Sequence, residues 1–212
     1  MSDGISADKS APKPVVTLFE SYGSGASYIG PRVAQALGLP FHEQAFSSQQ
    51  LEDAEARREN EGVLARFFGR MHTYGGVDVG DVTAGQRDDY QLVMENNRIV
   101  YEEARQGGVI MGRNGAFILS DRPATLHVKL DGPLEQRIAR AAEAANIDLA
   151  RAAKRQKRED QMRADMSIQL YGWDPRETDR YDLVINTGTL DLDACVEIIV
   201  HASKVKATRL VR

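Results

Sequence analysis

The most constraining feature of the chain is an apolar segment that runs through a glycine turn into a helical pattern. Residues 15–19 (VVTLF) have the composition of a buried strand, and the turn Tyr22-Gly23-Ser24-Gly25 follows. Apolar residues then recur at helical spacing over residues 29–37, and Gly38 is placed to end the helix. This order predicts a strand, a tight turn and a helix that packs back on the strand.

A strand that enters a helix through a glycine turn presents several backbone N–H groups and the positive end of the helix dipole to one point. We therefore predict a phosphate site formed by Gly23, Ser24, Gly25, Ala26 and Ser27. Compared with G-x-x-x-x-G-K-[ST], the chain matches at Gly25 and Ser27, but has Glu20 for the first glycine and Ala26 for the lysine. A glycine turn that binds no ligand is the alternative.

The rest of the chain alternates between short apolar runs and helical patterns, which predicts an α/β fold with a parallel sheet flanked by helices. Further strands are expected at residues 40–41, 109–111, 126–130 and 181–185, the last of them buried. Three apolar helix faces are expected: Tyr90, Val93, Val100 and Ala104; Leu134, Ile138, Ala141 and Ala145; and Leu192, Cys195, Ile199 and Ala202. A short helix is expected through Ala116 and Leu119.

Residues 151–163 (RAAKRQKREDQMR) form a separate, strongly basic stretch with six basic side chains in thirteen positions. It has almost no large apolar group, so we expect it to lie outside the core, either in solvent or over a ligand. A solvated charged helix is the simpler alternative, because Glu159 and Asp160 partly neutralise it. Asp160 is expected to orient a neighbouring arginine.

Composition excludes several classes of protein. The 212 residues have 27 Lys+Arg against 31 Asp+Glu, a net charge of −4 that favours neither nucleic acid nor an anionic membrane. One cysteine, Cys195, leaves no intrachain disulfide, which fits a cytoplasmic protein. No apolar run is long enough to span a membrane. We expect residues 1–13 to be a disordered tail and residues 14–212 to form one domain.

Three further features resemble parts of nucleoside monophosphate kinases and follow the same order. They are Gly112-Arg113 after a strand, the basic stretch, and residues 181–188 (YDLVINTG). Together with the opening VVTLFESYGSGASYIGPRVAQALGLPF, they resemble the cytidylate kinase-like family of P-loop proteins over residues 14–203. The resemblance implies a P-loop NTPase-type sheet with a monophosphate-binding insertion at residues 46–106 and a lid at residues 147–179.

The resemblance also implies roles for individual residues. The glycine turn would hold the phosphates of ATP, Ser27 would contact Mg²⁺, and Arg113 would grip the acceptor monophosphate. The catalytic lid arginines would be Arg155, Arg158 and Arg163. Asn186 and Thr187 would lie near the ATP base, although capping of the following helix is an equal alternative.

The chain departs from the family pattern at three positions. Ala26 stands where cytidylate kinases have a lysine, Ser27 where the kinase-like family usually has an arginine, and Asn114 where an aspartate follows the acceptor arginine. The expected activity is transfer of the ATP γ-phosphate to CMP or dCMP by a monomer or homodimer. The alternatives are a nucleotide-binding regulatory protein that has lost the chemistry, and a kinase of another small phosphate acceptor.

Overall fold

The computed structural model describes residues 12–44, 48 and 85–208, with side chains described from residue 91 onward in the second long range. Its centre is a parallel five-stranded sheet in the order β2-β3-β1-β4-β5. The strands are β1 (Val15–Glu20), β2 (Phe41–His42), β3 (Gly108–Met111), β4 (Thr125–Asp131) and β5 (Leu183–Asn186). Because the strands are parallel, their carboxyl ends meet at one edge, which is where open α/β sheets bind ligands.

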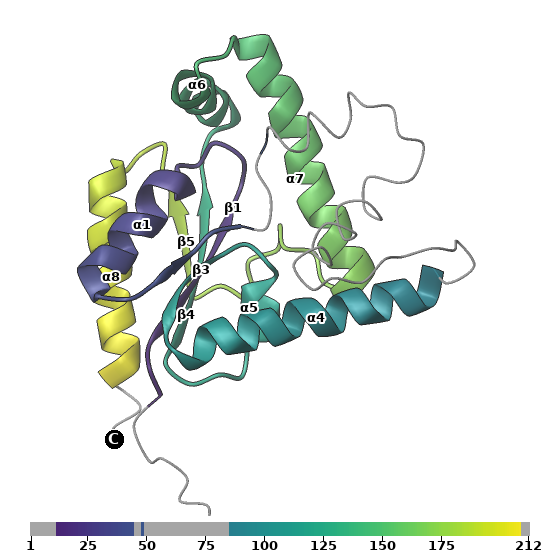
Figure 1. The fold of residues 1–212 in the computed structure, drawn as a ribbon. Helices are drawn as coiled ribbons and strands as arrows, with labels where there is room; N and C mark the ends of the chain where they lie inside the picture. Colours follow the sequence, from purple (N-terminus) through teal and green to yellow (C-terminus); the bar gives the residue numbers. More distant parts are fainter. Residues whose placement is uncertain (1–11, 45–47, 49–84, 209–212) are drawn as a thin grey trace, which may run out of the picture.

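Helices cover both faces of this sheet (Figure 1). They are α1 (Ala26–Leu37), α4 (Gly85–Arg105), α5 (Gly115–Ile118), α6 (Leu134–Ala145), α7 (Leu149–Tyr171) and α8 (Leu192–Thr208). Helices α1 and α8 lie on one face, and α4 and α5 lie on the other. Helix α6 follows the carboxyl end of β4, and α7 follows α6 and runs down past the carboxyl edge of the sheet. The fold is therefore the parallel α/β sheet flanked by helices that the sequence predicts, in agreement with the P-loop type that the resemblance implies.

Two apolar clusters hold the layers together. The larger cluster joins the sheet to α1 and α8 through side chains that include Val16, Leu18, Ile29, Val33, Cys195 and Ile199. The smaller cluster joins it to α4 and α5 through Val15, Val100, Ala104, Ile110, Ile118 and Leu119. Side chains of β1 are buried on both faces of the sheet, which explains why its sequence is a nearly continuous apolar run. Gly38 ends α1 in the left-handed conformation, as predicted.

Several expected faces differ from the structure. Leu134 and Ala145 of α6 are exposed, whereas Arg137, Ala141 and Ala142 are buried, because α6 packs its Arg137 side onto the glycine turn. On α4, Val100 and Ala104 are buried as predicted, but the face continues through Leu92 and Asn96. The last strand is only partly buried, since β5 is an edge strand and Val184 is 49% exposed.

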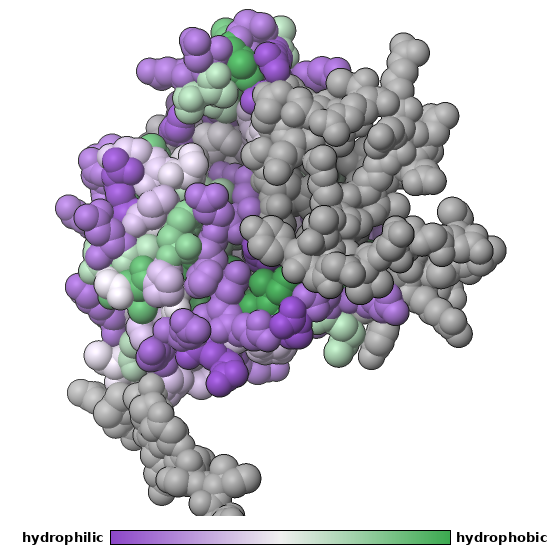
Figure 2. Space-filling model, in the orientation of Figure 1, coloured by the Kyte–Doolittle hydropathy of each residue, from purple (hydrophilic) through white to green (hydrophobic). Residues whose placement is uncertain are grey.

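The surface of the described part is largely hydrophilic in the space-filling view, with hydrophobic residues in small separate areas (Figure 2). Among the described helices, none is both long enough and apolar enough to cross a membrane. The expected tail lies outside the described residues except for its last two positions, and so does most of the expected insertion at residues 46–106.

Candidate functional site

The glycine turn, residues 21–25, connects the carboxyl end of β1 to α1. Gly23 and Gly25 have φ values of 79° and 91°, which residues with a Cβ atom rarely adopt. A Cβ atom on Gly23 would lie 2.2 Å from the carbonyl oxygen of Arg137, so only glycine fits there. Gly25 is the N-cap of α1 and makes no side-chain cap, which leaves the first amides of α1 to groups from elsewhere.

One amide of this turn is bound by a carboxylate of the chain itself. Asp160 Oδ1 accepts a hydrogen bond from the Tyr22 N–H group at 2.7 Å. Burial raises the pKa of Glu20 above its usual value of 4.5, although the charge of Arg163 opposes the shift. The Asp160 carboxylate thus takes up one amide of the turn, and the phosphate site at Gly23 to Ser27 stays a prediction.

The Ser24 side chain adds a free donor to the turn. Ser24 is fully buried, and its hydroxyl has no hydrogen-bond partner within the described part of the chain. A buried hydroxyl without a partner is costly, so it is a candidate donor of a hydrogen bond to a ligand. This hydroxyl and the glycine conformations fit a bound phosphate group.

Two arginines of α6 hold the carbonyl side of the turn. Arg137 Nη1 donates to the Tyr22 carbonyl oxygen at 2.8 Å, and Arg140 Nη1 donates to the Gly23 carbonyl oxygen at 2.9 Å. Arg137 also contacts Asp160 Oδ2 at 3.1 Å and is only 8% exposed. Sequence reasoning missed both arginines. The available signal was their spacing of three residues on a helix that directly follows a central strand.

Arg163 of α7 lies among three carboxylates at the carboxyl edge of the sheet. Its Nη2 is 3.1 Å from Glu159 Oε2 and 3.6 Å from Glu20 Oε1, and its Nη1 is 3.7 Å from Asp160 Oδ1. The Arg163 side chain is 10% exposed. The structure thus brings this expected lid arginine to the glycine turn, but its charge is offset by its neighbours.

The expectation that the basic stretch stays outside the core is wrong for three of its residues. Ala152 and Glu159 are fully buried, and Arg155 is 5% exposed. Close packing of α7 is possible because its inner side carries the small residues Ala152, Ala164 and Ser167, all buried. The third expected lid arginine, Arg158, has Nη2 at 3.6 Å from Glu159 Oε1. A single helix therefore carries all three expected lid arginines.

A cleft with a volume of about 80 Å³ opens between α7 and the carboxyl ends of β1 and β3. This volume is several times that needed by one ordered water. Arg113 and Arg163 both line the cleft, so the predicted acceptor arginine and one predicted lid arginine share it. Phe19 and Thr17 contribute from β1, and Trp173 contributes from the segment after α7.

The backbone at Arg113 is held in an unusual conformation. Arg113 and Asn114 have φ values of 57° and 56°, in the left-handed region. Such residues cost about 1–3 kcal/mol each and collect at functional sites. Asn96 Nδ2 donates to the Arg113 carbonyl oxygen at 3.0 Å and to the Tyr171 hydroxyl at 2.8 Å. The Tyr171 hydroxyl in turn donates to Asn97 Oδ1 at 3.1 Å. This chain of hydrogen bonds connects α4, α7 and the loop after β3.

Aromatic rings form the opposite wall of the cleft. Tyr181 packs against Trp173 and Phe19, with ring centroids 5.7 Å and 6.0 Å apart. Phe117 packs behind Trp173 at 6.1 Å. Sequence reasoning missed this wall, although a short segment after the basic stretch holds Tyr171, Trp173 and Tyr181. Aromatic faces of this kind are suited to stacking against a planar ring.

The sequence model of the cytidylate kinase-like family matches residues 15–189. The chain belongs to the cytidylate kinase-like family. A cytidylate kinase of Methanopyrus kandleri is 27% identical over 194 residues, which cover 87% of this chain and 90% of that relative. A cytidylate kinase of Staphylothermus marinus is 30% identical over 139 residues, which cover 65% of this chain and 76% of that relative.

Other similarities are narrower or concern the fold alone. A uronate isomerase of Corynebacterium glutamicum is 36% identical over 111 residues, so the match spans 52% of this chain but about a fifth (21%) of that relative. An uncharacterized protein from Eubacterium ventriosum has a TM-score of 0.65 at 18% identity, covering 91% of this chain and 99% of that chain. A gluconokinase from Sinorhizobium meliloti has a TM-score of 0.52 at 17% identity, covering 95% and 98%. Family membership supports a phosphotransferase.

The departures of this cytidylate kinase-like chain from its family pattern can be placed in the structure. Ala26 is fully buried in the larger apolar cluster, and Ser27 is exposed in the first turn of α1. Asn114 lines the cleft beside Arg113. The glycine turn therefore receives no cationic side chain from residues 26 and 27, and the arginines of α6 and α7 supply the positive charge there.

Asn186 and Thr187 do not cap α8. Asp191 does so, because its Oδ1 accepts from the Ala194 N–H group at 2.7 Å. The Thr187 carbonyl oxygen accepts from Arg140 Nη2 at 2.7 Å, and Asn186 Oδ1 accepts from the Gly188 N–H group at 2.9 Å. The capping alternative is therefore wrong, and Thr187 shares Arg140 with the glycine turn.

Buried polar side chains of β4 lie on the same face of the sheet as the cleft. His127 Nδ1 is 2.8 Å from Thr17 Oγ1, and burial lowers the pKa of His127 to about 4. Lys129 donates to the Arg176 carbonyl oxygen at 2.5 Å, and its Nζ lies 5.9 Å from the ring centroid of Tyr181. Burial lowers the pKa of Lys129 as well. His127 and Lys129 therefore pack against Thr17 and Tyr181, which line the cleft.

Proposed function

We propose that the chain transfers the γ-phosphoryl group of ATP to a nucleoside monophosphate, with CMP or dCMP as the first acceptors. The observation that carries this proposal is the position of Arg113 and Arg163, which come from different elements and line one cleft. Arg163 also lies 3.6 Å from Glu20, the last residue of β1 before the glycine turn. Phosphoryl transfer requires two anionic substrates to be aligned and their charge neutralised. Two arginines in one cleft are suited to that task.

The residues around the site divide into those for the donor and those for the acceptor. In this proposal the turn from Gly23 to Ser27 holds the donor phosphates, with the Ser24 hydroxyl as a further donor of a hydrogen bond. Ser27 is the Mg²⁺ ligand, and Asn186 and Thr187 lie toward the base of ATP. When bound, ATP would supply the phosphoryl group, and Mg²⁺ would neutralise part of the charge of the phosphates. Arg113 binds the acceptor phosphate.

The lid arginines Arg155, Arg158 and Arg163 then stabilise the transferring group and exclude water. We propose that residues 147–179 act as this lid. The position of α7 supports that role, because the helix passes the carboxyl edge of the sheet and its middle contacts the glycine turn through Asp160 (Figure 1). Asp160 supports it too, since this residue of α7 binds the turn directly through the Tyr22 N–H group.

A cytosine acceptor is supported by the orientation of Asn96. The Nδ2 group of Asn96 donates to the Arg113 carbonyl oxygen and to the Tyr171 hydroxyl. This engages both N–H donors of the amide and leaves its oxygen as an acceptor in a residue that lines the cleft. Cytosine presents an amino group where uracil presents a carbonyl oxygen, so the arrangement favours cytosine.

A coupled assay for ADP formation tests this function. CMP, dCMP, UMP, AMP and GMP are compared as acceptors, next to thermal-shift measurements with ATP and with each acceptor. ADP formation that is fastest with CMP or dCMP supports the proposal. Equal rates with UMP contradict the assignment of Asn96, and the absence of turnover with all five acceptors contradicts a nucleoside monophosphate kinase.

A second function is favoured by one specific observation. Ala26 and Ser27 supply no cation to the glycine turn, and Arg163 is offset by three carboxylates. A nucleotide-binding regulatory protein needs the fold and the cleft but not the transfer step. Thermal stabilisation by nucleotides without any ADP formation identifies this function.

A further inference from the structure

Glu159 of α7 places a carboxylate inside the protein. It is fully buried, and no other carboxylate in the described part of the chain is buried. Two arginines of the same helix compensate its charge. Glu159 Oε2 accepts a hydrogen bond from Arg163 Nη2 at 3.1 Å, and Oε1 lies 3.6 Å from Arg158 Nη2. A buried ion pair often stabilises a protein no more than apolar residues would, so the arrangement points to a role other than general stability.

The contact with Glu159 fixes one side of the Arg163 guanidinium group. Arg163 Nη2 donates to Glu159 Oε2 and, at 3.4 Å, to Gln44 Oε1. Arg163 Nη1 is buried and has no hydrogen-bond partner within the described part of the chain. Asp160 Oδ1 is 3.7 Å from Nη1, which is beyond hydrogen-bond distance. Because Arg163 lines the cleft, Nη1 is a donor that remains for an anionic ligand.

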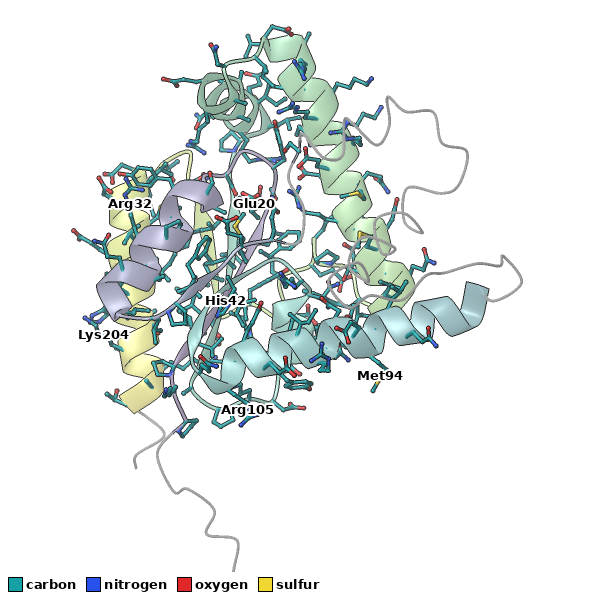
Figure 3. All side chains as sticks on the ribbon, viewed as in Figure 1. Glu20, Arg32, His42, Met94, Arg105 and Lys204 are labelled. Carbon is teal, nitrogen blue, oxygen red and sulfur yellow. The ribbon has the colours of Figure 1, made fainter. Side chains whose placement is uncertain are left out.

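The other two carboxylates near Arg163 do not hold it by a hydrogen bond. Glu20 Oε1 lies 3.6 Å from Arg163 Nη2, and Figure 3 labels Glu20 at the carboxyl edge of the sheet. Asp160 binds elsewhere, since its Oδ1 accepts from the Tyr22 N–H group at 2.7 Å. Glu159 precedes Arg163 by four residues, the spacing and order that favour such a pair on a helix. Glu159 is therefore the carboxylate that sets the orientation of Arg163.

We propose that Glu159 is a positioning residue for phosphoryl transfer, which holds Arg163 so that its Nη1 group is ready for the transferring phosphoryl group. This role rests on the proposed function, because it takes Arg163 as the arginine that stabilises that group. A donor that is already oriented needs no reorganisation in the transition state. Glu159 contacts Arg163 and not the acceptor, so its replacement should lower kcat and leave the acceptor KM nearly unchanged.

Initial rates of ADP formation by Glu159→Gln, with the best of the five acceptors, test this role. Gln keeps the shape of the side chain but loses the charge and one acceptor oxygen, so the Arg163 guanidinium group should shift. A small misplacement of a catalytic group can cost about 10² in rate. We therefore expect kcat to fall by at least about tenfold. The acceptor KM should stay within about threefold of the wild-type value, and the ADP affinity measured by calorimetry should not change.

Glu102→Gln is the matched control. Glu102 of α4 is exposed and forms an ion pair with Arg98 at 2.8 Å, four residues apart as in the Glu159 pair. The same substitution there removes the same charge and the same kind of contact outside the cleft. The kcat of Glu102→Gln should equal that of the wild type.

A double-mutant cycle tests whether Glu159 acts through Arg163. Residues that act as a unit have strongly non-additive effects on rate. In the Arg163→Lys background, Glu159→Gln should therefore lower kcat by less than about threefold. A purely structural role of Glu159 would lower the free energy of unfolding without this coupling in kcat. Full additivity of the two substitutions overturns the proposal.

Glu159→Asp keeps the test valid if the Gln variant does not fold. It retains the buried charge, but its side chain is one methylene shorter, so the contact with Arg163 Nη2 changes. Its kcat should lie between those of the wild type and Glu159→Gln. A wild-type kcat in folded Glu159→Gln, or in Glu159→Asp if the Gln variant does not fold, overturns the proposal and leaves the proposed function intact. If the wild type forms no ADP with any of the five acceptors, the proposed function fails, and this role of Glu159 fails with it.

Discussion

The Arg137 guanidinium group donates to the carbonyl oxygen of Tyr22 at 2.8 Å, so helix α6 holds the glycine turn by its backbone. Arg137 Nε also donates to the Gly132 carbonyl oxygen at 3.0 Å, and its Nη1 contacts Asp160 at 3.1 Å. One buried side chain thus connects the end of β1, the end of β4 and α7. The site depends on this connection as much as on the residues that face a substrate.

Replacement of Arg137 by Ala should destabilise the protein strongly. The change leaves two carbonyl oxygens and the partly buried Asp160 without this partner, and loss of one member of a buried ion pair costs at most roughly 3–5 kcal/mol. Urea denaturation measures the loss. Arg137→Lys keeps the charge but not the fork of donors, so it should be intermediate. A stability loss below about 1 kcal/mol for Arg137→Ala would show that the connection is not structural.

Arg113→Ala should weaken binding of the acceptor without unfolding the protein. Arg113 is partly exposed and lines the cleft, and a charge-assisted contact with a phosphate is worth at least a factor of about ten. The acceptor KM should therefore rise by at least about tenfold, as measured by initial rates of ADP formation. Arg105→Ala is the control, because Arg105 is an exposed arginine in the last turn of α4. Equal acceptor KM values for Arg113→Ala and Arg105→Ala would show that Arg113 does not bind the acceptor.

Arg163 should affect turnover through its geometry as well as its charge. Arg163→Lys keeps a positive charge among Glu20, Glu159 and Asp160, so the fold should survive. Lysine lacks the planar fork of donors, and loss of one transition-state donor typically lowers kcat by about 10²–10³. Single-turnover rates report the transfer step, and the affinity for ADP reports nucleotide binding, so the two measurements together show which of them the substitution changes. A kcat near that of the wild type would show that another cation stabilises the transferring phosphoryl group.

The stability of the protein should decline as the pH falls from 6.5 to about 4 because of His127. Burial lowers the pKa of His127 to about 4 in the folded state, whereas the unfolded chain titrates near 6.5. The unfolded state therefore binds a proton first, and the contribution of His127 to stability is present above pH 6.5 and is lost toward pH 4. It amounts to about 3 kcal/mol. Urea midpoints of the wild type and His127→Gln across this range measure it, and parallel pH profiles would contradict it.

The sequence predicted the first strand, turn and helix well because their signal is local. Apolar residues over 15–19, glycines at the turn and helical spacing up to Gly38 depend on neighbours in the chain, and β1 and α1 agree with them. The prediction for α6 was less accurate. Its buried side carries Arg137, because a contact with the Tyr22 backbone determines which side of the helix faces inward.

The sequence by itself determined the family, the parallel sheet and the position of the glycine turn, since these follow from local patterns of residues and their order. Only the tertiary structure decided which charges meet. Glu20 and Arg163 are far apart in the chain, yet they lie 3.6 Å apart, and Asp160 reaches the Tyr22 amide. Such pairings depend on how helices pack on the sheet, because electrostatic contacts form between groups whose separation no local pattern encodes.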